Sequence, residues 1–133
     1  MTELRFTIPG RPVTKKNSQR IFVNRKTGTR FVRPSGAFEA YQEACGAYIP
    51  HQWAMLDGPV NLKCVYYMPT RRRVDLCNLL GATCDILVHY GMLKDDNSGV
   101  VASHDGSRVL YDKDHPRVDI TITEAKKNEA SGE

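Results

Sequence analysis

The chain has 133 residues and a mass of 15.0 kDa, which suits one globular domain and leaves too little room for two. With 41% hydrophobic and 26% charged residues, the composition excludes a disordered chain, and no apolar run approaches the ~18 residues of a membrane span. The first residues lack the basic and apolar regions of a secretory signal, and the four cysteines contain no C-x-x-C pair. We therefore expect a cytoplasmic protein with reduced thiols and no membrane anchor, zinc ribbon or disulfide framework.

Charge is distributed unevenly along the chain. Residues 1–74 carry 13 lysines and arginines against 4 aspartates and glutamates, a net of +9. Residues 75–133 carry 6 against 11, a net of −5, which leaves +4 for the whole chain. A basic half joined to an acidic half indicates a polyanionic partner held near carboxylates, although solvated surface charge that happens to segregate gives the same pattern.

Alternating and β-branched patterns predict three short strands in the first third of the chain. They are Leu4–Ile8, Arg20–Val23 and Thr29–Val32, and residues 24–28, which end in glycine, would join the last two strands as a hairpin. Ser35 is a candidate N-cap for a helix. The apolar positions of that helix recur at helical spacing until Pro50: Phe38, Tyr41, Cys45 and Tyr48.

The remainder of the chain contains one strong strand, one helix and several weaker strands. Val60–Met68 alternates strictly, and a helix begins at Asp75 and ends at Gly91. Further strands are predicted at Val100–Ser103, Arg108–Tyr111 and Val118–Thr123, the first two joined as a hairpin by an Asp105-Gly106 turn. This order predicts an α/β (α+β) domain over residues 1–124, with a small mixed, largely antiparallel sheet, two main helices packed on it and a C-terminal tail, 125–133.

The most informative region lies between the strong strand and the end of the second helix. Three arginines, Arg71–Arg73, directly precede Asp75, and further aspartates follow within and after the helix: Asp85, Asp95 and Asp96. A loop that returned past the helix could gather these carboxylates, which would repel one another without a cation. Carboxylate oxygens suit Mg²⁺ or Mn²⁺, and adjoining arginines suit metal-assisted phosphodiester hydrolysis.

Simpler interpretations stay open for each residue alone. Asp75 is equally well explained as a helix N-cap, the Asp95-Asp96 pair as a turn, and the arginines as a solvated strand end. Cys77 and Cys84 lie two helical turns apart, about 10.5 Å along the axis, which is too far for one zinc ion. We therefore expect both cysteines to be buried apolar residues.

Residues from about Phe6 to Glu124 resemble the RusA-type Holliday-junction resolvases of phages and prophages. The centre of the resemblance is an arginine run, the pattern D-L-C-N-L from Asp75, Asp85 one helix length later, and a G-x-x-x-D-D turn from Gly91. The openings P-G-R-P at residues 9–12 and K-K-N-S at residues 15–18 also match, as does the closing I-T-E at residues 122–124.

This resemblance implies an α/β fold with a mixed sheet, a homodimer, and nicking of a four-way junction on two strands. It implies a catalytic divalent metal, Mg²⁺ with Mn²⁺ as a substitute, bound by Asp75 and Asp96 with Asp85 and Asp95 close by. We take Asp75, Asp96 and Asp85 as the catalytic candidates. The expected DNA-binding residues are Lys15, Lys16, Asn17, Arg71, Arg72, Arg73 and Asn78.

Two positions depart from the family pattern. Cys77 stands where the family has a second aspartate, and Gly81 stands where many members have lysine or, in some phage relatives, glutamate. The two positions are four residues apart and share a helical face. A thiolate is a poor ligand for a hard cation such as Mg²⁺, so a metal ligand and a charged group are both missing from one side of the helix.

The acidic cluster and the arginine run, together with this resemblance, therefore imply a Mg²⁺-dependent, structure-selective endodeoxyribonuclease that resolves Holliday junctions by paired nicks in DNA recombination and repair. Its partners would be branched DNA and a second copy of the chain, with no small-molecule cofactor. A catalytically weak or inactive branched-DNA binding protein of the same fold is the alternative. A general nucleic-acid packaging protein is a third possibility.

Overall fold

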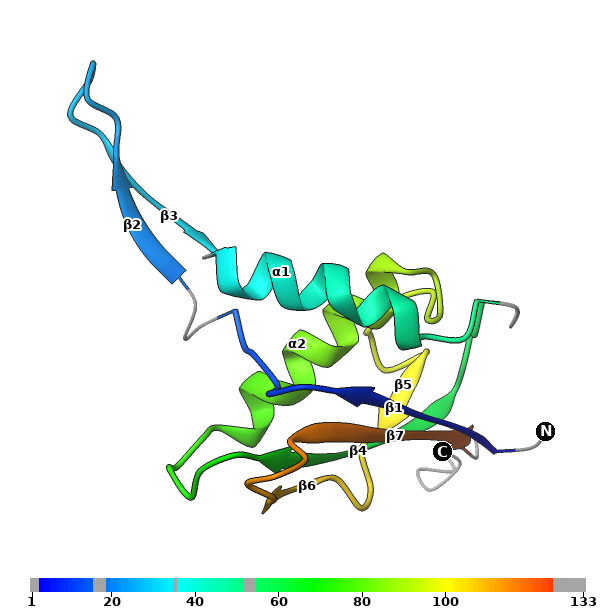
Figure 1. Ribbon diagram of the computed structural model, residues 1–133. Coiled ribbons are helices and arrows are strands. Elements are labelled where there is room, and N and C mark those ends of the chain that lie inside the picture. Colours follow the sequence, from blue (N-terminus) through cyan, green and yellow to red (C-terminus); the bar gives the residue numbers. More distant parts are fainter. Residues whose placement is uncertain (1–2, 16–18, 35, 52–54, 126–133) are drawn as a thin grey trace.

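The computed structural model describes residues 3–15, 19–34, 36–51 and 55–125. Its main body has two layers, a five-stranded sheet and two helices that lie on the same face of that sheet (Figure 1). This arrangement confirms the predicted α+β class with a mixed sheet. In chain order the elements are β1 (Leu4–Pro9), β2 (Gln19–Val23), β3 (Arg30–Pro34), α1 (Gly36–Cys45), the 3₁₀ turn η2 (Gly46–Tyr48), β4 (Val60–Met68), α2 (Leu76–His89), β5 (Val101–Ser103), β6 (Arg108–Tyr111) and β7 (Arg117–Glu124).

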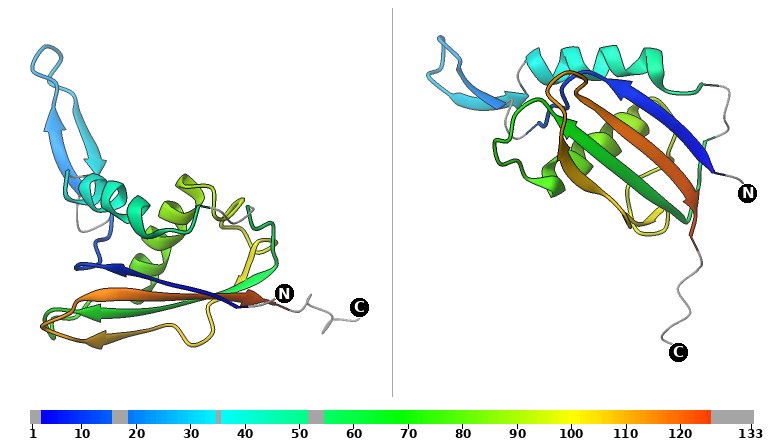
Figure 2. Two further views of the ribbon diagram at one scale, coloured as in Figure 1. Left: turned by 45° about the vertical axis from the view of Figure 1, so that its right-hand side comes forward. Right: turned by 60° about the horizontal axis from the view of Figure 1, so that its bottom comes forward.

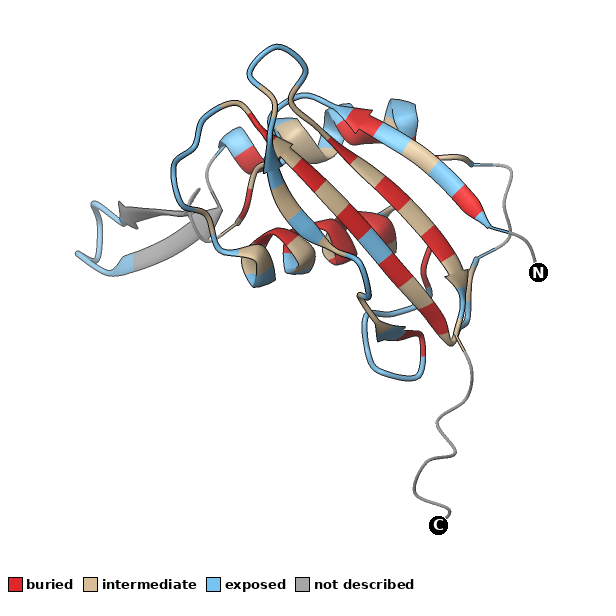
Figure 3. Cartoon of the chain, turned by 90° about the horizontal axis from the view of Figure 1, so that it is seen from below, coloured by how far each residue is buried: buried red, intermediate tan, exposed pale blue. Residues whose placement is uncertain are grey.

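The long strand β4 organises the sheet. It pairs antiparallel with β7 over its length, and β7 pairs antiparallel with β1 at the far edge. On its other side β4 pairs in parallel with β5 and β6. Because side chains alternate across a strand, β4 buries every second residue beneath the helices, as the striped strands of Figure 3 show. The buried side chains of β4 are Val60, Leu62, Cys64, Tyr66 and Met68.

The predicted hairpin between β5 and β6 is wrong. Both strands run parallel to β4 along one edge, β5 beside the start of β4 and β6 beside its end. The Asp105-Gly106 turn connects them and is tied to β4 by the Asn61 side chain, whose Oδ1 accepts a 2.7 Å bond from the Asp105 N–H. His104 Nδ1 lies 2.9 Å from the carbonyl oxygen of Leu62. The turn residues allow the two strands to pair with each other or with a third strand, and only the sequence-distant β4 decides between these arrangements.

The core lies between the buried face of the sheet and the two helices. α1 contributes Phe38 and Cys45, and the apolar stripe of α2 includes Leu79 and Leu87. The layers are also joined by a polar contact, because Tyr66 Oη of β4 lies 2.6 Å from Thr83 Oγ1 of α2. That contact satisfies two polar groups that are shielded from water.

The ends of both helices agree with their predicted boundaries. α1 continues as the 3₁₀ turn to Tyr48, shortly before Pro50. α2 ends at His89, and Gly91 follows with φ +77°, a conformation that favours glycine. The predicted N-cap Ser35 lies outside the described residues, as do residues 126–133 of the predicted tail.

Strands β2 and β3 form a separate two-stranded ribbon. They pair antiparallel as a hairpin, as predicted, but residues 24–29 join them, so the connection is one residue longer than the predicted 24–28. The ribbon projects from the main body beside the start of α1 (Figures 1 and 2). It therefore lies apart from the core that holds the two layers together.

Candidate functional site

The predicted arginine run lies on the surface where β4 leads into α2. Arg71, Arg72 and Arg73 are all exposed and follow the last buried residue of β4 after a short turn. The Arg71 guanidinium lies 4.1 Å from the centroid of the Tyr111 ring at the end of β6. This cation–π contact orients one of the three cations, and the run offers a concentrated positive surface to an anion.

Asp75 caps the N-terminus of α2. Its Oδ1 accepts backbone bonds from Cys77 N at 2.9 Å and from Asn78 N at 3.4 Å, which satisfies donors that the helix cannot pair internally. Both bonds go to Oδ1, so the cap does not use Oδ2, which is left as a potential ligand. Asn78 is half-buried in the first turn of α2. The interpretation of Asp75 as an N-cap is therefore correct, and it is compatible with metal binding through the second oxygen.

The other predicted carboxylates gather at the opposite end of α2. Asp85 and the pair Asp95 and Asp96 line one open hollow of about 420 Å³, together with Lys15 from the segment after β1. Lys15 Nζ lies 3.1 Å from Asp85 Oδ2 and 5.5 Å from the centroid of the Phe38 ring. The ammonium group thus pairs with Asp85 in a hollow that two further carboxylates line, and this concentration of negative charge favours a cation.

The loop that follows α2 fixes the orientation of Asp95. The Asp96 N–H donates to Asp95 Oδ1 at 2.7 Å, and Asn97 Nδ2 donates to Asp95 Oδ2 at 3.0 Å. These bonds, first that from the Asp96 backbone, lower the pKa of Asp95 below its ordinary value. Asp95 and Asp96 therefore form both a turn, as the simpler interpretation has it, and a paired acidic surface.

Helix geometry separates the two groups of acids. Asp75 and Asp85 are ten residues apart on one continuous helix, about 15 Å along the axis at 1.5 Å per residue. Asp96 lies near the later part of the helix, in the same hollow as Asp85. Accordingly, burial raises the pKa of the Cys84 thiol to about 11, with smaller contributions from the negative charges of Asp96 and then Asp85. Oxygen ligands of one Mg²⁺ each lie about 2.1 Å from the ion, so Asp75 and Asp85 of one chain are too far apart to share it.

The donor chemistry of the acidic residues suits a hard divalent cation, because every candidate offers carboxylate oxygens. Within the part of the chain that the structure describes, however, no three His, Cys, Asp or Glu side chains come close enough to hold one ion. In a single chain, Asp85, Asp95 and Asp96 share one hollow, and Asp75 does not line it.

The two departures from the family pattern both lie on the exposed side of α2. Cys77 is exposed, so the prediction that it is a buried apolar residue is wrong, whereas Cys84 is buried as predicted. Gly81 is exposed as well, and a Cβ added there would meet nothing within 4 Å. The exposure of Cys77 follows from its place in the first turn, outside the apolar stripe. Two of the predicted DNA-binding residues, Lys16 and Asn17, lie outside the described residues.

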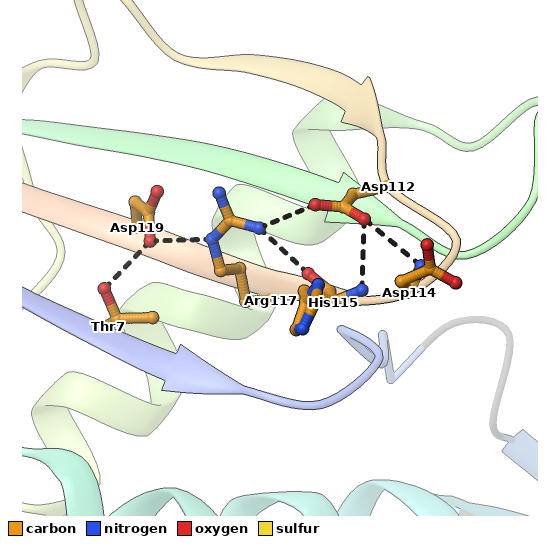
Figure 4. Close-up of polar contacts among 6 residues, drawn as sticks. All are labelled: Thr7, Asp112, Asp114, His115, Arg117 and Asp119. Atoms are coloured by element: carbon orange, nitrogen blue, oxygen red, sulfur yellow. Dashed lines mark hydrogen bonds and ion pairs between the residues drawn. The ribbon is translucent and has the colours of Figure 1, made fainter.

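A second polar cluster, which the sequence analysis did not identify, lies on the open face of the sheet (Figure 4). Arg117 Nη1 donates to Asp112 Oδ2 and to the His115 carbonyl, both at 3.0 Å, and its Nε lies 3.4 Å from Asp119 Oδ1. Its guanidinium carbon lies 3.8 Å from the centroid of the Tyr67 ring. The cluster ties the loop before β7 to the sheet, so we assign it a structural role. The i, i+2 spacing of Arg117 and Asp119 on a strand is the sequence signal that could have found it.

The comparisons with known proteins agree with this combination of fold and surface. An α+β domain with an arginine run and carboxylates along one helix defines a candidate phosphodiester-cleaving protein. The chain matches the family model described as endodeoxyribonuclease RusA over residues 9–123 and belongs to that family. No curated protein gives a significant match to the chain. None of the helices in the described ranges is long and apolar enough to cross a membrane.

Proposed function

We propose that this protein is a Mg²⁺-dependent endonuclease that resolves Holliday junctions by paired nicks in DNA recombination and repair. Family membership supports endodeoxyribonuclease activity. The observation that carries the finer proposal is the exposed run Arg71–Arg73 directly beside Asp75, at the N-terminal end of α2. The helix terminus and three guanidinium groups favour a phosphate there, within reach of a carboxylate whose Oδ2 is not used by the cap.

Each group of residues contributes a separate function in this proposal. Arg71–Arg73 and Lys15 neutralise phosphates and position the branch without reading bases. Asp75, Asp96 and one of Asp85 and Asp95 hold the metal. When bound, Mg²⁺ polarises a phosphoryl oxygen and lowers the pKa of an attacking water. Lys15 balances the carboxylates in the absence of the ion.

We infer further that the metal site is completed by a second copy of the chain. Asp75 is too far from Asp85 to share one ion within a chain and does not line the hollow of Asp85, Asp95 and Asp96. An antiparallel approach of two copies about a two-fold axis could place Asp75 of one copy near that hollow of its partner. Two equivalent sites would then form, one for each nicked strand. This explains why the described residues of one chain hold no complete site.

The test incubates a labelled four-way junction with the protein and millimolar Mg²⁺ or Mn²⁺, with EDTA as the metal-free control. We expect paired nicks with either metal and none with EDTA. Asp75→Asn and Asp96→Asn, each as a pure homodimer, should lower nicking by at least about 10²-fold, which corresponds to the loss of one charged transition-state contact. Nicking that survives in both variants would refute the assignment of these carboxylates.

Mixed dimers test the shared site. If Asp75 of one copy works with Asp96 of the other, a dimer of one Asp75→Asn chain and one Asp96→Asn chain keeps one intact site and loses the other. When the two variants are refolded together, about half of the dimers should be mixed and should make single nicks, whereas each variant alone stays inactive. If each site instead used both acids of one chain, the mixture would be as inactive as its components.

One observation favours the second candidate, a branched-DNA binding protein with little cleavage. Cys77 presents an exposed thiol in the first turn of α2, beside Asp75, where the family pattern places a carboxylate. A thiol binds Mg²⁺ poorly, and this would weaken metal binding while leaving the arginine run intact. Tight binding of the four-way junction without nicks in Mg²⁺ or Mn²⁺ would establish this alternative.

A further inference from the structure

The ribbon formed by β2 and β3 has no place in the two-layered body or in the proposed metal site. It projects into solvent as a free pair of strands (Figures 1 and 2). We propose that this ribbon enters the major groove of one duplex arm of the branched DNA and binds it through the three cations of its tip, Arg25, Lys26 and Arg30. The inference rests on the proposed function for its substrate and adds a second DNA-binding surface to it.

The charge of the ribbon is of one sign. Residues 19–34 contain five lysines and arginines and no aspartate or glutamate. The tip residues 23–30 are all exposed, and the cations Arg25, Lys26 and Arg30 lie among them. No ion pair within the described residues involves any of these three cations. Charges left without counter-charges on a thin projection create a strong local field that attracts a polyanion.

The tip is held in one conformation by its own hydrogen bonds. Asn24 N donates to the Thr29 carbonyl at 2.8 Å, and Gly28 N donates to the Asn24 carbonyl at 2.7 Å. Asn24 Oδ1 also accepts from Lys26 N at 2.9 Å, and Thr27 Oγ1 donates to Thr29 Oγ1 at 2.9 Å. Gly28 takes φ +73°, which completes the turn. Since the backbone that carries the cations is already ordered, binding loses little entropy there.

The shape of the ribbon selects the groove. Two paired strands lie about 4.8 Å apart, and the major groove of B-form DNA, about 12 Å wide, admits a two-stranded β-ribbon, whereas the minor groove, about 6 Å wide, would first have to be widened at a cost in deformation energy. Five residues of strand reach roughly 16 Å, enough for the tip to approach the floor of the groove while its arginines face phosphates or base edges.

The experiment compares two triple variants that remove the same charge. The tip variant carries Arg25→Gln, Lys26→Gln and Arg30→Gln. The matched control carries Lys63→Gln, Arg108→Gln and Lys113→Gln, which are exposed cations of the main body outside the proposed site. Binding to a four-way junction and to a linear duplex is measured in EDTA over a range of salt, so that the result does not depend on cleavage. Protection of guanine N7 from dimethyl sulfate reports occupancy of the major groove.

We expect the wild-type protein and the control variant to protect guanine N7 atoms in one stretch of a junction arm, and the tip variant to lose that protection. The slope of log K against log salt should fall by about 2.7 for the tip variant, 0.9 for each lost phosphate contact, with a loss of affinity of several hundred-fold near 0.1 M salt. The control should change the slope by less than about 1.

The outcomes separate this inference from the proposed function. If the wild-type protein binds the junction but leaves guanine N7 reactive, or if the tip variant keeps the wild-type slope, the ribbon does not enter the major groove, and the nuclease proposal is unaffected. If the wild-type protein binds neither the junction nor the duplex, both proposals are refuted.

Discussion

At the scale of single residues, Asp75 combines a structural and a proposed chemical role that substitution can separate. Asparagine caps helices about as well as aspartate, but it carries no charge for a cation. Asp75→Asn should therefore leave the free energy of unfolding within about 0.5 kcal/mol of the wild-type value while nicking is lost. Asp75→Ala should lose nicking and also about 1 kcal/mol of stability. Urea unfolding and junction nicking measure the two effects, and wild-type nicking by Asp75→Asn would leave Asp75 as a cap alone.

Cys77 gives a gain-of-function test at the neighbouring position. It is exposed in the first turn of α2, so Cys77→Asp adds a carboxylate without disturbing the core. The new charge also interacts favourably with the helix N-terminus, by about 0.3–1 kcal/mol. We expect a nicking rate raised by roughly 10-fold or more and half-maximal activity at lower Mg²⁺, since a hard ligand replaces a soft one. Cys77→Ser is the matched control, and equal rates for both variants would show that this position does not reach the metal.

At the scale of elements, alanine substitutions at Gly81 in α2 and at Gly46 at the start of η2 should change the free energy of unfolding in opposite directions. Gly81 is exposed in α2, and an added Cβ meets no atom within 4 Å, so Gly81→Ala should stabilise the fold by up to about 1 kcal/mol. At Gly46 the same Cβ would lie 2.8 Å from the ring of Tyr90, whose hydroxyl donates to the Gln42 carbonyl at 2.7 Å. Gly46→Ala should therefore destabilise, by about 1–3 kcal/mol. Thermal unfolding of both variants checks the signs.

The loop between β6 and β7 should contribute to stability in a pH-dependent way. The N–H of His115, then the Arg117 guanidinium and the N–H of Asp114, lower the pKa of Asp112 below its ordinary value of 3.8. This stabilisation is complete above that value and is lost as the pH falls through the lowered pKa of the folded state. Asp112→Asn should thus be less stable than the wild type at pH 6, and the difference should shrink as the pH falls from 4 towards 2. A difference that stays constant over this range would exclude a contribution from the Asp112 charge.

The elements show how far the sequence could predict this structure. The β4 range was predicted to the residue because its alternation is strict, and the end of α2 because Gly91 suits a positive φ. The pairing of β5 and β6 with β4 was not predicted, because an Asp-Gly turn has the same local sequence whether the two strands pair with each other or with a third strand. For the candidate site, the limit on prediction has a different cause. The helical rise that separates Cys77 from Cys84 also separates Asp75 from Asp85, so their separation was predictable, whereas the position of the Asp95–Asp96 loop depends on packing.

At the scale of the whole molecule, the proposed sharing of one metal site between two copies predicts that activity depends on assembly. We expect a mass of two chains by sedimentation equilibrium at concentrations where nicking is measured. Below the dissociation constant of the dimer, the nicking rate should fall with the square of the protein concentration, a 100-fold loss for each 10-fold dilution, because both sites need two copies. A rate that stays linear with concentration in a protein shown to be monomeric would exclude the shared site.

The contact between Tyr66 and Thr83 affects the surface that carries Arg71–Arg73. It joins β4 to α2, and residues 69–75 span the gap between those two anchored elements. The segment that carries the guanidinium groups of Arg71–Arg73 is consequently pinned at both termini, and the Asp75 cap fastens its downstream end. A segment that is held at both ends in this way would bind a sugar–phosphate backbone without changing its own conformation. The bend that docking requires would then have to come from the nucleic acid.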